Sequence, residues 1–430
     1  MSFPRYPSYK DSGVEWLGDV PEHWEVKPVK KLASIINGYP FDSALFDSAE
    51  GFPLIRIRDL NKLKAETFYK GEFVESASIT SDDVLIGMDG DFNVGRWRGN
   101  GRALLNQRMC CVRGESNILT RLLEYALPIR LKAINDVTYA TTVKHLASSQ
   151  VEKTFVAIPP DTAEQTQIVA FLDRETAKID ELVAEQRRLM ELLKEKRSAV
   201  ISHAVTQGLN PHAPMKPSGI EWLGDVPEHW TVISAKRVSS VFVPQRNKPD
   251  LNAEGDGLFW VTMDQMRNEE INSAELSVTE SAARVAGTRV LPAGSVVASC
   301  VGTFGLAAIN NVDVIINQQL QAFIPTDRID AKFMRYCVLI AEGYFEQIGT
   351  AATIAYVNQL GFANMPMALP PKVEQHQIVQ FLVVESAKFD TLTTEAQRAI
   401  TLLQERRTAL ISAAVTGQID VRQLTEEQAA

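Results

Sequence analysis

Two long segments of this 430-residue chain repeat each other, and their length constrains the fold more than any other feature of the sequence. Residues 164–206 and 374–416 align without a gap at an offset of 210, and 24 of the 43 positions are identical. Neither segment contains glycine or proline, whereas a proline pair precedes each one and a glycine follows it. These boundaries predict two helices of about 64 Å each.

Apolar residues recur along both segments at alternating spacings of four and three, a heptad pattern that is typical of a coiled coil. Neither helix can bury such a stripe alone, so we expect the two helices to pack on each other. They should run antiparallel, because the second copy returns the chain. The predicted seam passes through Ile168, Leu172, Glu175, Ile179, Leu182, Gln186, Leu189 and Leu193, and through the positions 210 residues later in the second segment.

A shorter repeat precedes each long one. SGVEWLGDVPEHW at residues 12–24 returns as SGIEWLGDVPEHW at residues 218–230, with twelve of thirteen positions identical. We call these two stretches the short repeats. The intervening residues 26–157 and 232–368, here the first and second variable domains, resemble each other only weakly. Apolar runs such as VLIGM, SVVASCV and VIINQQLQAFIP, broken by Gly, Asn, Asp and Pro, predict short strands in them.

The predicted fold class is therefore α+β, with two mixed α/β domains separated by two long antiparallel coiled-coil helices and an internal pseudo-two-fold, circular repeat. The expected boundaries are 1–158 for the first domain, 159–209 for the first helix, 210–369 for the second domain, 370–417 for the second helix and 418–430 for a C-terminal tail.

Composition and charge limit the classes of protein. The chain has 45% hydrophobic residues and a net charge of −9, which opposes a broadly basic nucleic-acid-binding surface. One stretch departs from this balance, because residues 92–113 contain five arginines and no acid. Four cysteines without a C-x-x-C spacing, no apolar run of about 18 residues and a polar start lead us to expect a reduced, cytoplasmic protein with no membrane span.

Motifs for catalysis are missing from the sequence. It contains no N-P-P-Y or D-P-P-Y stretch whose aromatic ring would stack on a flipped base, and no phosphate-binding G-x-x-x-x-G-K-[ST] loop. The six histidines show no metal-ligand spacing, so we expect neither a metal site nor a catalytic residue in this chain.

The repeated motifs resemble a known family. EWLGDVPEHW at the start of each half, IPP or LPP followed by EQ-x-QI-V-x-FL, and a helix that ends in (K/R)R-x-A-(V/L)-IS-x-AVT look like the specificity subunit of type I restriction-modification systems. The resemblance covers essentially the whole chain. It implies a non-catalytic subunit whose two target-recognition domains each read one half of a split DNA sequence. It also implies a scaffold for two methyltransferase subunits, which would carry S-adenosylmethionine and methylate adenine, and for restriction subunits.

Candidate DNA contacts are basic and amide side chains in loops. In both domains the alternative is a solvated loop without a ligand. The Asn106–Gln107 pair recurs as Asn317–Gln318, and a residue kept in both domains cannot easily specify two different half-sites, so we assign these pairs a role in the fold. The candidates are Arg96, Arg98, Arg102 and Arg108 in the first variable domain and Gln245, Arg246, Lys248 and Arg267 in the second.

The tryptophans of the short repeats are candidates for partner binding, or else they pack each domain onto a helix end; they are Trp16, Trp24, Trp222 and Trp230. Two other functions stay open at this point. A self-sufficient DNA modification enzyme would need the catalytic motifs that are missing. A two-domain adaptor that binds only protein would confer no DNA sequence preference.

Overall fold

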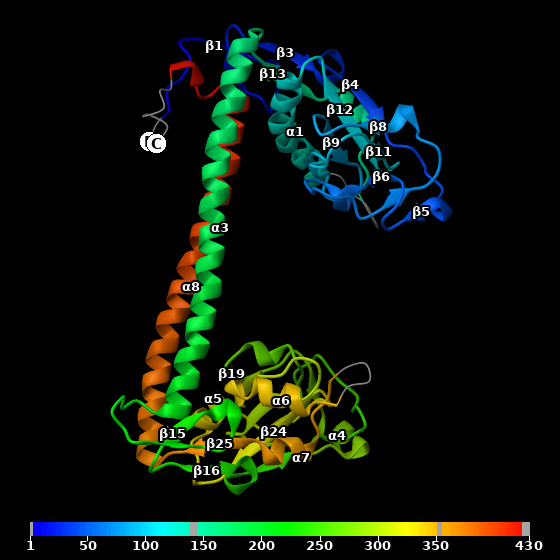
Figure 1. Cartoon of the computed structure of the whole chain (residues 1–430). Coiled ribbons are helices and arrows are strands. Elements are labelled where there is room, and N and C mark those ends of the chain that lie inside the picture. The colour runs from blue at the N-terminus through cyan, green and yellow to red at the C-terminus, as the bar shows by residue number, and fades with distance from the viewer. Residues whose placement is uncertain (1–2, 138–143, 351–354, 424–430) are drawn as a thin grey trace. The chain divides into compact units, whose positions relative to one another are not determined.

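A computed structural model describes residues 3–137, 144–350 and 355–423 (Figure 1). The chain folds into two compact units. Unit 1 contains Met1–Gln186 and Arg398–Ala430, and unit 2 contains the continuous stretch Arg187–Gln397. Each unit therefore combines one variable domain with parts of both long helices. Within the described residues, no helix is long and apolar enough to cross a membrane.

The two long helices are present as predicted. Helix α3 spans Thr162–Gln207 and helix α8 spans Lys372–Val415. Each ends just before a glycine with a positive φ, 77° at Gly208 and 72° at Gly417, a backbone conformation that stops a helix at little steric cost. The mean α-helix of a globular protein has only about 11–12 residues, so helices of this length need a partner helix.

Ion pairs between the helices give their direction. In unit 1, Asp180 of α3 lies 3.2 Å from Arg407 of α8. In unit 2, Arg197 of α3 lies 2.6 Å from Asp390 of α8. The partner on α8 moves toward the start of that helix as the position on α3 advances, so the helices run antiparallel, as expected (Figure 1).

The predicted seam is buried from Ile168 to Ile179 and is wrong at two of its later positions. Leu182 and Leu189 are 43% and 42% exposed, whereas the next residue after Leu182, Val183, is 8% exposed. The buried line runs from Ile179 by four residues to Val183, so beyond Ile179 the steps of four and three follow each other in the opposite order from the predicted one. The same displacement occurs in α8, where Leu392 is 45% exposed. Exposed leucines on the outer face of the helices also fit the heptad spacing, so periodicity did not distinguish them from the buried positions.

The first variable domain contains two main sheets. Their strands are β4 (Ala33–Asn37), β5 (Phe46–Asp47), β6 (Phe52–Ile55), β7 (Phe68–Tyr69), β8 (Ser78–Ile79), β9 (Val84–Gly87), β10 (Val94–Gly95), β11 (Ala103–Leu105) and β12 (Met109–Gly114). One sheet has the antiparallel order β10-β9-β12-β4, and the other has the order β5-β7-β6-β11-β8 with β6 and β11 parallel.

The second variable domain repeats this plan. Its strands are β17 (Ser239–Phe242), β18 (Leu258–Val261), β19 (Glu270–Ile271), β20 (Ser277–Val278), β21 (Val296–Ser299), β22 (Ala307–Asn310), β23 (Val314–Ile316) and β24 (Leu320–Pro325). The order β17-β24-β21-β22 matches β4-β12-β9-β10, and the parallel pair β18 and β23 matches β6 and β11. A shared topology therefore underlies two domains whose sequences have diverged.

Continuous apolar runs form the central strands because both faces of these strands are covered. All four residues of β9 and of β21 are buried. A helix packs on the first sheet in each domain: α1 (Asn117–Val137) covers β12 and β9, and α5 (Ala331–Ile340) covers β22 and β21. The shorter helices are α2 (Ser148–Glu152), α4 (Glu280–Ala286), α6 (Glu342–Ile348) and α7 (Gln359–Asn364).

Small two-stranded sheets connect each domain to the long helices. They pair β1 (Tyr9–Asp11) with β2 (Asp19–Pro21), β3 (Glu25–Pro28) with β13 (Phe155–Ile158), β14 (Met215–Pro217) with β15 (Asp225–Pro227), and β16 (Thr231–Ser234) with β25 (Pro366–Leu369). In unit 1 the start and end of the chain meet here, because the backbone N–H of Asp420 donates to the carbonyl of Pro4 at 2.8 Å. The rest of the predicted tail, 424–430, lies outside the described residues.

Candidate nucleic-acid interface

Arg96 and Arg98 lie in one loop but have different surroundings. The guanidinium of Arg96 is largely buried and its Nε lies 3.1 Å from Glu124 of α1. Burial lowers the pKa of Arg96, and the carboxylate of Glu124 opposes that shift. The side chain of Arg98 is exposed, and it makes no ion pair with the described residues. Arg98 is therefore the better placed of the two for a contact with another molecule.

Arg102 and Arg108 are exposed but each is held by an acid of its own domain. Arg102 pairs with Glu75, donates from Nε to the hydroxyl of Ser78 at 3.0 Å, and lies 4.5 Å above the ring of Phe73. Arg108 pairs with Asp89, which also accepts from a ring nitrogen of His145 at 2.8 Å. These pairs fix the loop geometry and are weak at exposed sites, so a stronger anion could replace them.

The candidates of the second variable domain are more exposed. Arg246 and Lys248 are exposed and have no ion pair among the described residues, while Arg267 has an 84% exposed side chain and a long 4.0 Å contact with Asp264. Gln245 differs, because its side-chain oxygen accepts from the backbone N–H of Arg289 at 3.2 Å. Gln245 therefore shapes the loop from which Arg246 and Lys248 project.

Two side chains hold this loop, and only one of them was singled out from the sequence. The side chain of Gln318 donates to the carbonyl of Gln245 at 3.1 Å, and Arg289 donates to the carbonyl of Val243 at 2.9 Å while lying 4.7 Å above the ring of Phe242. The recurrence of the Asn–Gln pair was the available signal for Gln318. No sequence signal marked Arg289.

The Asn–Gln pairs occupy equivalent turns. The backbone N–H of Asn106 donates to the carbonyl of Ile55 at 3.0 Å, and that of Asn317 donates to the carbonyl of Val261 at 3.0 Å. Each asparagine carbonyl then accepts from the residue three positions later. This equivalence fits the fold role that we assigned to both pairs.

The four tryptophans divide into buried and half-buried pairs. Trp24 and Trp230 are 0% and 1% exposed and pack where the short repeats meet the long helices. Their contacts fit the packing role, which was one of the two alternatives. Trp16 and Trp222 are half-buried, with Arg130 5.8 Å from the ring of Trp16 and Tyr344 6.4 Å from that of Trp222. These two keep an accessible face.

Metal-binding clusters are absent from the described residues: no group of three or more His, Cys, Asp or Glu side chains is placed to hold an ion there. The four cysteines, Cys110, Cys111, Cys300 and Cys337, are free and buried. Burial raises the pKa of Cys110 to about 12 and that of Cys300 to about 11, which suppresses the nucleophilic thiolate form.

Comparison with known proteins identifies the family to which this chain is similar. A model of the type I restriction modification DNA specificity domain matches residues 21–190 and 227–402, one copy over each half of the chain. The specificity subunit of the type I restriction enzyme EcoBI from Escherichia coli is 27% identical over 433 residues, covering 95% of this chain and 89% of that protein. The MjaVIII specificity subunit from Methanocaldococcus jannaschii is 23% identical, covering 94% of this chain and 95% of that protein.

A solved structure shares the fold. In a study of complex assembly and conformational transition of the type I R-M system, one chain matches with a TM-score of 0.68 at 16% identity, and the match covers 92% of this chain and 98% of that chain. The motifs, the repeated topology and the two matched domains agree. This chain belongs to the family of type I restriction-modification specificity subunits.

Proposed function

We propose that this chain is the DNA-recognition subunit of a type I restriction-modification complex and that each variable domain reads one half of a split target. The observation that carries the proposal is that two domains of one topology present different loops. Arg98 projects from a loop of the first domain, and Arg246 and Lys248 project from a loop of the second. These loops have diverged in sequence, whereas the strands of the two domains follow the same order in their main sheets. Two different half-sites require this combination.

Exposed cations without an internal ion pair are the best candidates for direct contact with DNA. Arg98, Arg246 and Lys248 meet this condition, and Arg267 nearly does. Arg96, Arg102 and Arg108 would act mainly by holding the loops in shape. With a net charge of −9, the subunit alone should bind DNA weakly, and a partner must supply much of the attraction to phosphates.

The partners in this proposal are two copies of one methyltransferase subunit, together with restriction subunits, inside the cytoplasm. Equivalent apolar side chains are exposed on both long helices. Leu182 and Leu392 are 43% and 45% exposed, and Leu192 and Leu402 are 51% and 54% exposed. Matched pairs 210 positions apart are what two copies of one partner would bind. Catalysis and S-adenosylmethionine would belong to that partner, so this chain itself would be no enzyme.

Exchange of one domain tests the reading of DNA. Residues 26–157 would be replaced by those of a relative with a different target, and methylation would be mapped in cells that also express the methyltransferase partner. We expect one half-site to change and the other to stay. A change of both half-sites would contradict the proposal that the domains read DNA independently. An unchanged target would indicate an adaptor that binds only protein. Methyl transfer by the purified chain alone would instead establish an enzyme.

Point variants sharpen the assignment of side chains. Arg98→Ala should weaken DNA binding by the assembled complex, either uniformly with a salt slope reduced by about one, or at one base pair by about 1–3 kcal/mol. Arg102→Ala is the matched control, because Arg102 already pairs with Glu75. Equal effects of both variants would show that the loop acts as a unit rather than through Arg98.

A further inference from the structure

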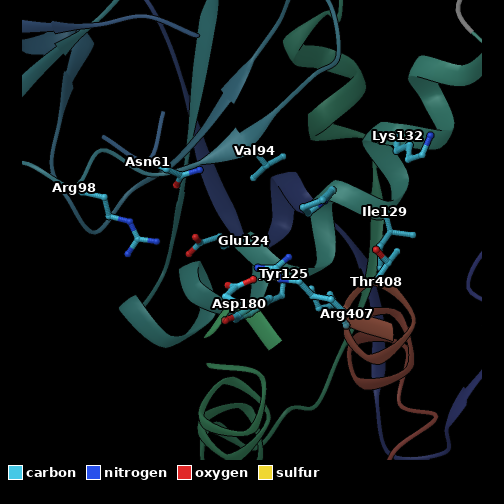
Figure 2. A pocket seen from close by; sticks show the side chains of 12 residues that line it. Asn61, Val94, Arg98, Glu124, Tyr125, Ile129, Lys132, Asp180, Arg407 and Thr408 are labelled. Atoms are coloured by element: carbon cyan, nitrogen blue, oxygen red, sulfur yellow. Dashed lines mark ion pairs between the residues drawn. The ribbon is translucent and has the colours of Figure 1, made fainter. Parts of the chain in front are cut away.

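A cavity of about 530 Å³ opens within unit 1, between the first variable domain and the long helices (Figure 2). Asn61 and Arg98 come from domain loops, Glu124 and Tyr125 from α1, Asp180 from α3 and Arg407 from α8. Its volume lies within the range of small-molecule sites, roughly 300–1,000 Å³.

The cavity carries one unmatched positive charge. Among the other charged residues of its lining, Glu124 lies 3.1 Å from Arg96, Asp180 lies 3.2 Å from Arg407, and Lys132 lies 3.0 Å from Asp136. Arg98 points toward Glu124 and the cavity in Figure 2, but no acid among the described residues pairs with it. Its charge is felt nearby, because Arg98 and Arg121 add to the burial that lowers the pKa of Arg96. The cavity therefore favours an anion.

Unit 2 shows which group occupies the equivalent place. There Glu269 lies 3.1 Å from Arg197 and 3.3 Å from Arg335, and Arg197 also lies 2.6 Å from Asp390. Arg197 and Asp390 correspond to Arg407 and Asp180 through the offset of 210. Arg197 of α3 is thus paired with two carboxylates, one from α8 and one, Glu269, from the second variable domain.

No carboxylate of the first variable domain joins Arg407 in this way within the part of the chain that the structure describes. Asn61 lines the cavity there, and its side-chain oxygen accepts from the backbone N–H of Arg96 at 3.2 Å. The first domain therefore leaves the place beside Arg407 open to an outside anion.

The rest of the lining suits an organic molecule rather than a bare ion. Val94, Pro128, Ile129 and Ile411 give the cavity an apolar wall, and Tyr125 adds a ring whose hydroxyl donates to Asp173 at 2.5 Å. A flat apolar group can lie on this wall while an anionic head reaches the arginines.

We propose that this cavity binds a small phosphorylated molecule of the nucleoside monophosphate class, with its phosphate between Arg98 and Arg407 in the place that the carboxylate of Glu269 takes in unit 2. The proposal does not depend on DNA recognition by this chain. Arginine suits the role because its planar guanidinium forms paired hydrogen bonds with phosphate oxygens.

Calorimetric titration of the full chain with adenosine monophosphate tests the proposal. We expect one site, tighter than that for inorganic phosphate. Asn61→Asp supplies the missing carboxylate in nearly the same shape and tolerates the positive φ of 62°, so it should weaken binding more than tenfold. Asn61→Gly suits the same backbone without adding charge and should bind as the wild type does. Arg98→Gln and Arg407→Gln should each weaken binding, whereas Arg102→Gln should not.

Three results would overturn the proposal. One is the absence of binding by the wild type at concentrations on the order of 1 mM. Another is equal affinity of the wild type and Asn61→Asp, with circular dichroism showing both folded. The third is a nucleotide affinity that Arg98→Gln and Arg407→Gln both leave unchanged. Methylation mapping of Asn61→Asp separates this site from target recognition, because the mapped target should stay unchanged.

Discussion

The carboxylate of Glu164 accepts a hydrogen bond from the indole nitrogen of Trp24 at 2.9 Å, inside the junction of unit 1. The same carboxylate accepts from the hydroxyl of Tyr6 at 2.8 Å and lies 2.9 Å from a ring nitrogen of His23. Its counterpart in unit 2, Glu374, has one such contact among the residues that the structure describes, with His229 at 2.9 Å. Nearly identical sequences thus support junctions of unequal strength.

This inequality predicts different costs for one substitution at two equivalent sites. Glu164→Gln replaces a buried charged acceptor with an amide whose nitrogen faces donors, so we expect a loss of about 1.5–3 kcal/mol in the stability of unit 1. Glu374→Gln should cost less than about 1 kcal/mol, because the side chains of Glu374 and His229 are 25% and 52% exposed. Urea unfolding of both variants, followed by hydrogen exchange in each unit, measures the difference. Equal losses would contradict the network.

The buried thiols predict resistance to alkylation. At pH 8 a thiol with a pKa of about 11 or 12, as at Cys300 and Cys110, is ionised in only about one molecule in 10³–10⁴. We expect iodoacetamide to label none of the four cysteines of the native protein within a time that labels all four in urea. Mass spectrometry of peptides reads the result, and rapid native labelling of Cys110 would show that the first domain opens.

The same thiols set the direction of a pH effect on stability. Their pKa is raised by folding, so the folded state holds its protons more tightly than the unfolded chain does. Their contribution is complete below the ordinary thiol pKa of about 8.5 and is lost as the pH rises from there toward the folded values. When the pH is raised from 7.5 to 10, the denaturation midpoint should therefore fall more for the wild type than for the double variant Cys110→Ala with Cys300→Ala.

Cations of the second domain should contribute to DNA binding individually. Arg246→Ala and Lys248→Ala should each reduce the salt slope of binding by the assembled complex by about one if they contact phosphates. Arg284 is a control in the same domain, since it is exposed but pairs with Glu280 at 2.8 Å along α4. Filter binding at several salt concentrations gives the slopes. Unchanged slopes in both variants would remove this loop from the interface.

The ion pairs between the long helices predict which insertions they tolerate. Seven extra residues in both α3 and α8, near residues 188 and 398, keep the heptad seam and both pairs, Asp180 with Arg407 and Arg197 with Asp390. Such a variant should fold and, under the proposed function, recognise half-sites separated by more unread bases. Four residues, about one turn, added to α3 alone shift the seam and should destabilise the protein. Methylation mapping and thermal melts distinguish the two variants, and an unchanged spacer after the paired insertion would contradict the proposal.

The long helices, their direction and the repeated domain topology followed from the sequence, because a 43-residue repeat without glycine or proline leaves few alternatives. The buried face of each helix followed only as far as Ile179 in α3 and Phe389 in α8. Leu182 is as apolar as Val183, and the difference in their burial arises from the partner helix rather than from either residue. Periodicity alone fixes a seam only to within one residue when apolar side chains flank it.

The candidate site was less accessible to sequence reasoning. Arginines could be found by their spacing, but Arg96 and Arg98 differ only through the position of Glu124, which is 26 residues beyond Arg98. The contrast between Arg197, which Glu269 of its domain joins, and Arg407, which pairs with Asp180 of α3, was hidden too, because the variable domains have diverged in sequence. Three-dimensional contacts were needed to find it.

Unit 2 is one unbroken stretch of chain, whereas unit 1 needs residues from both ends, joined where Asp420 donates to Pro4 and Tyr9 donates to Gly417. This has a consequence during synthesis on the ribosome. Unit 2 is complete once residue 397 has emerged, while the first domain waits for the end of α8 with the apolar face of α3 uncovered. The first domain is thus the later one to mature and the one that most depends on protection from aggregation while the chain is being made.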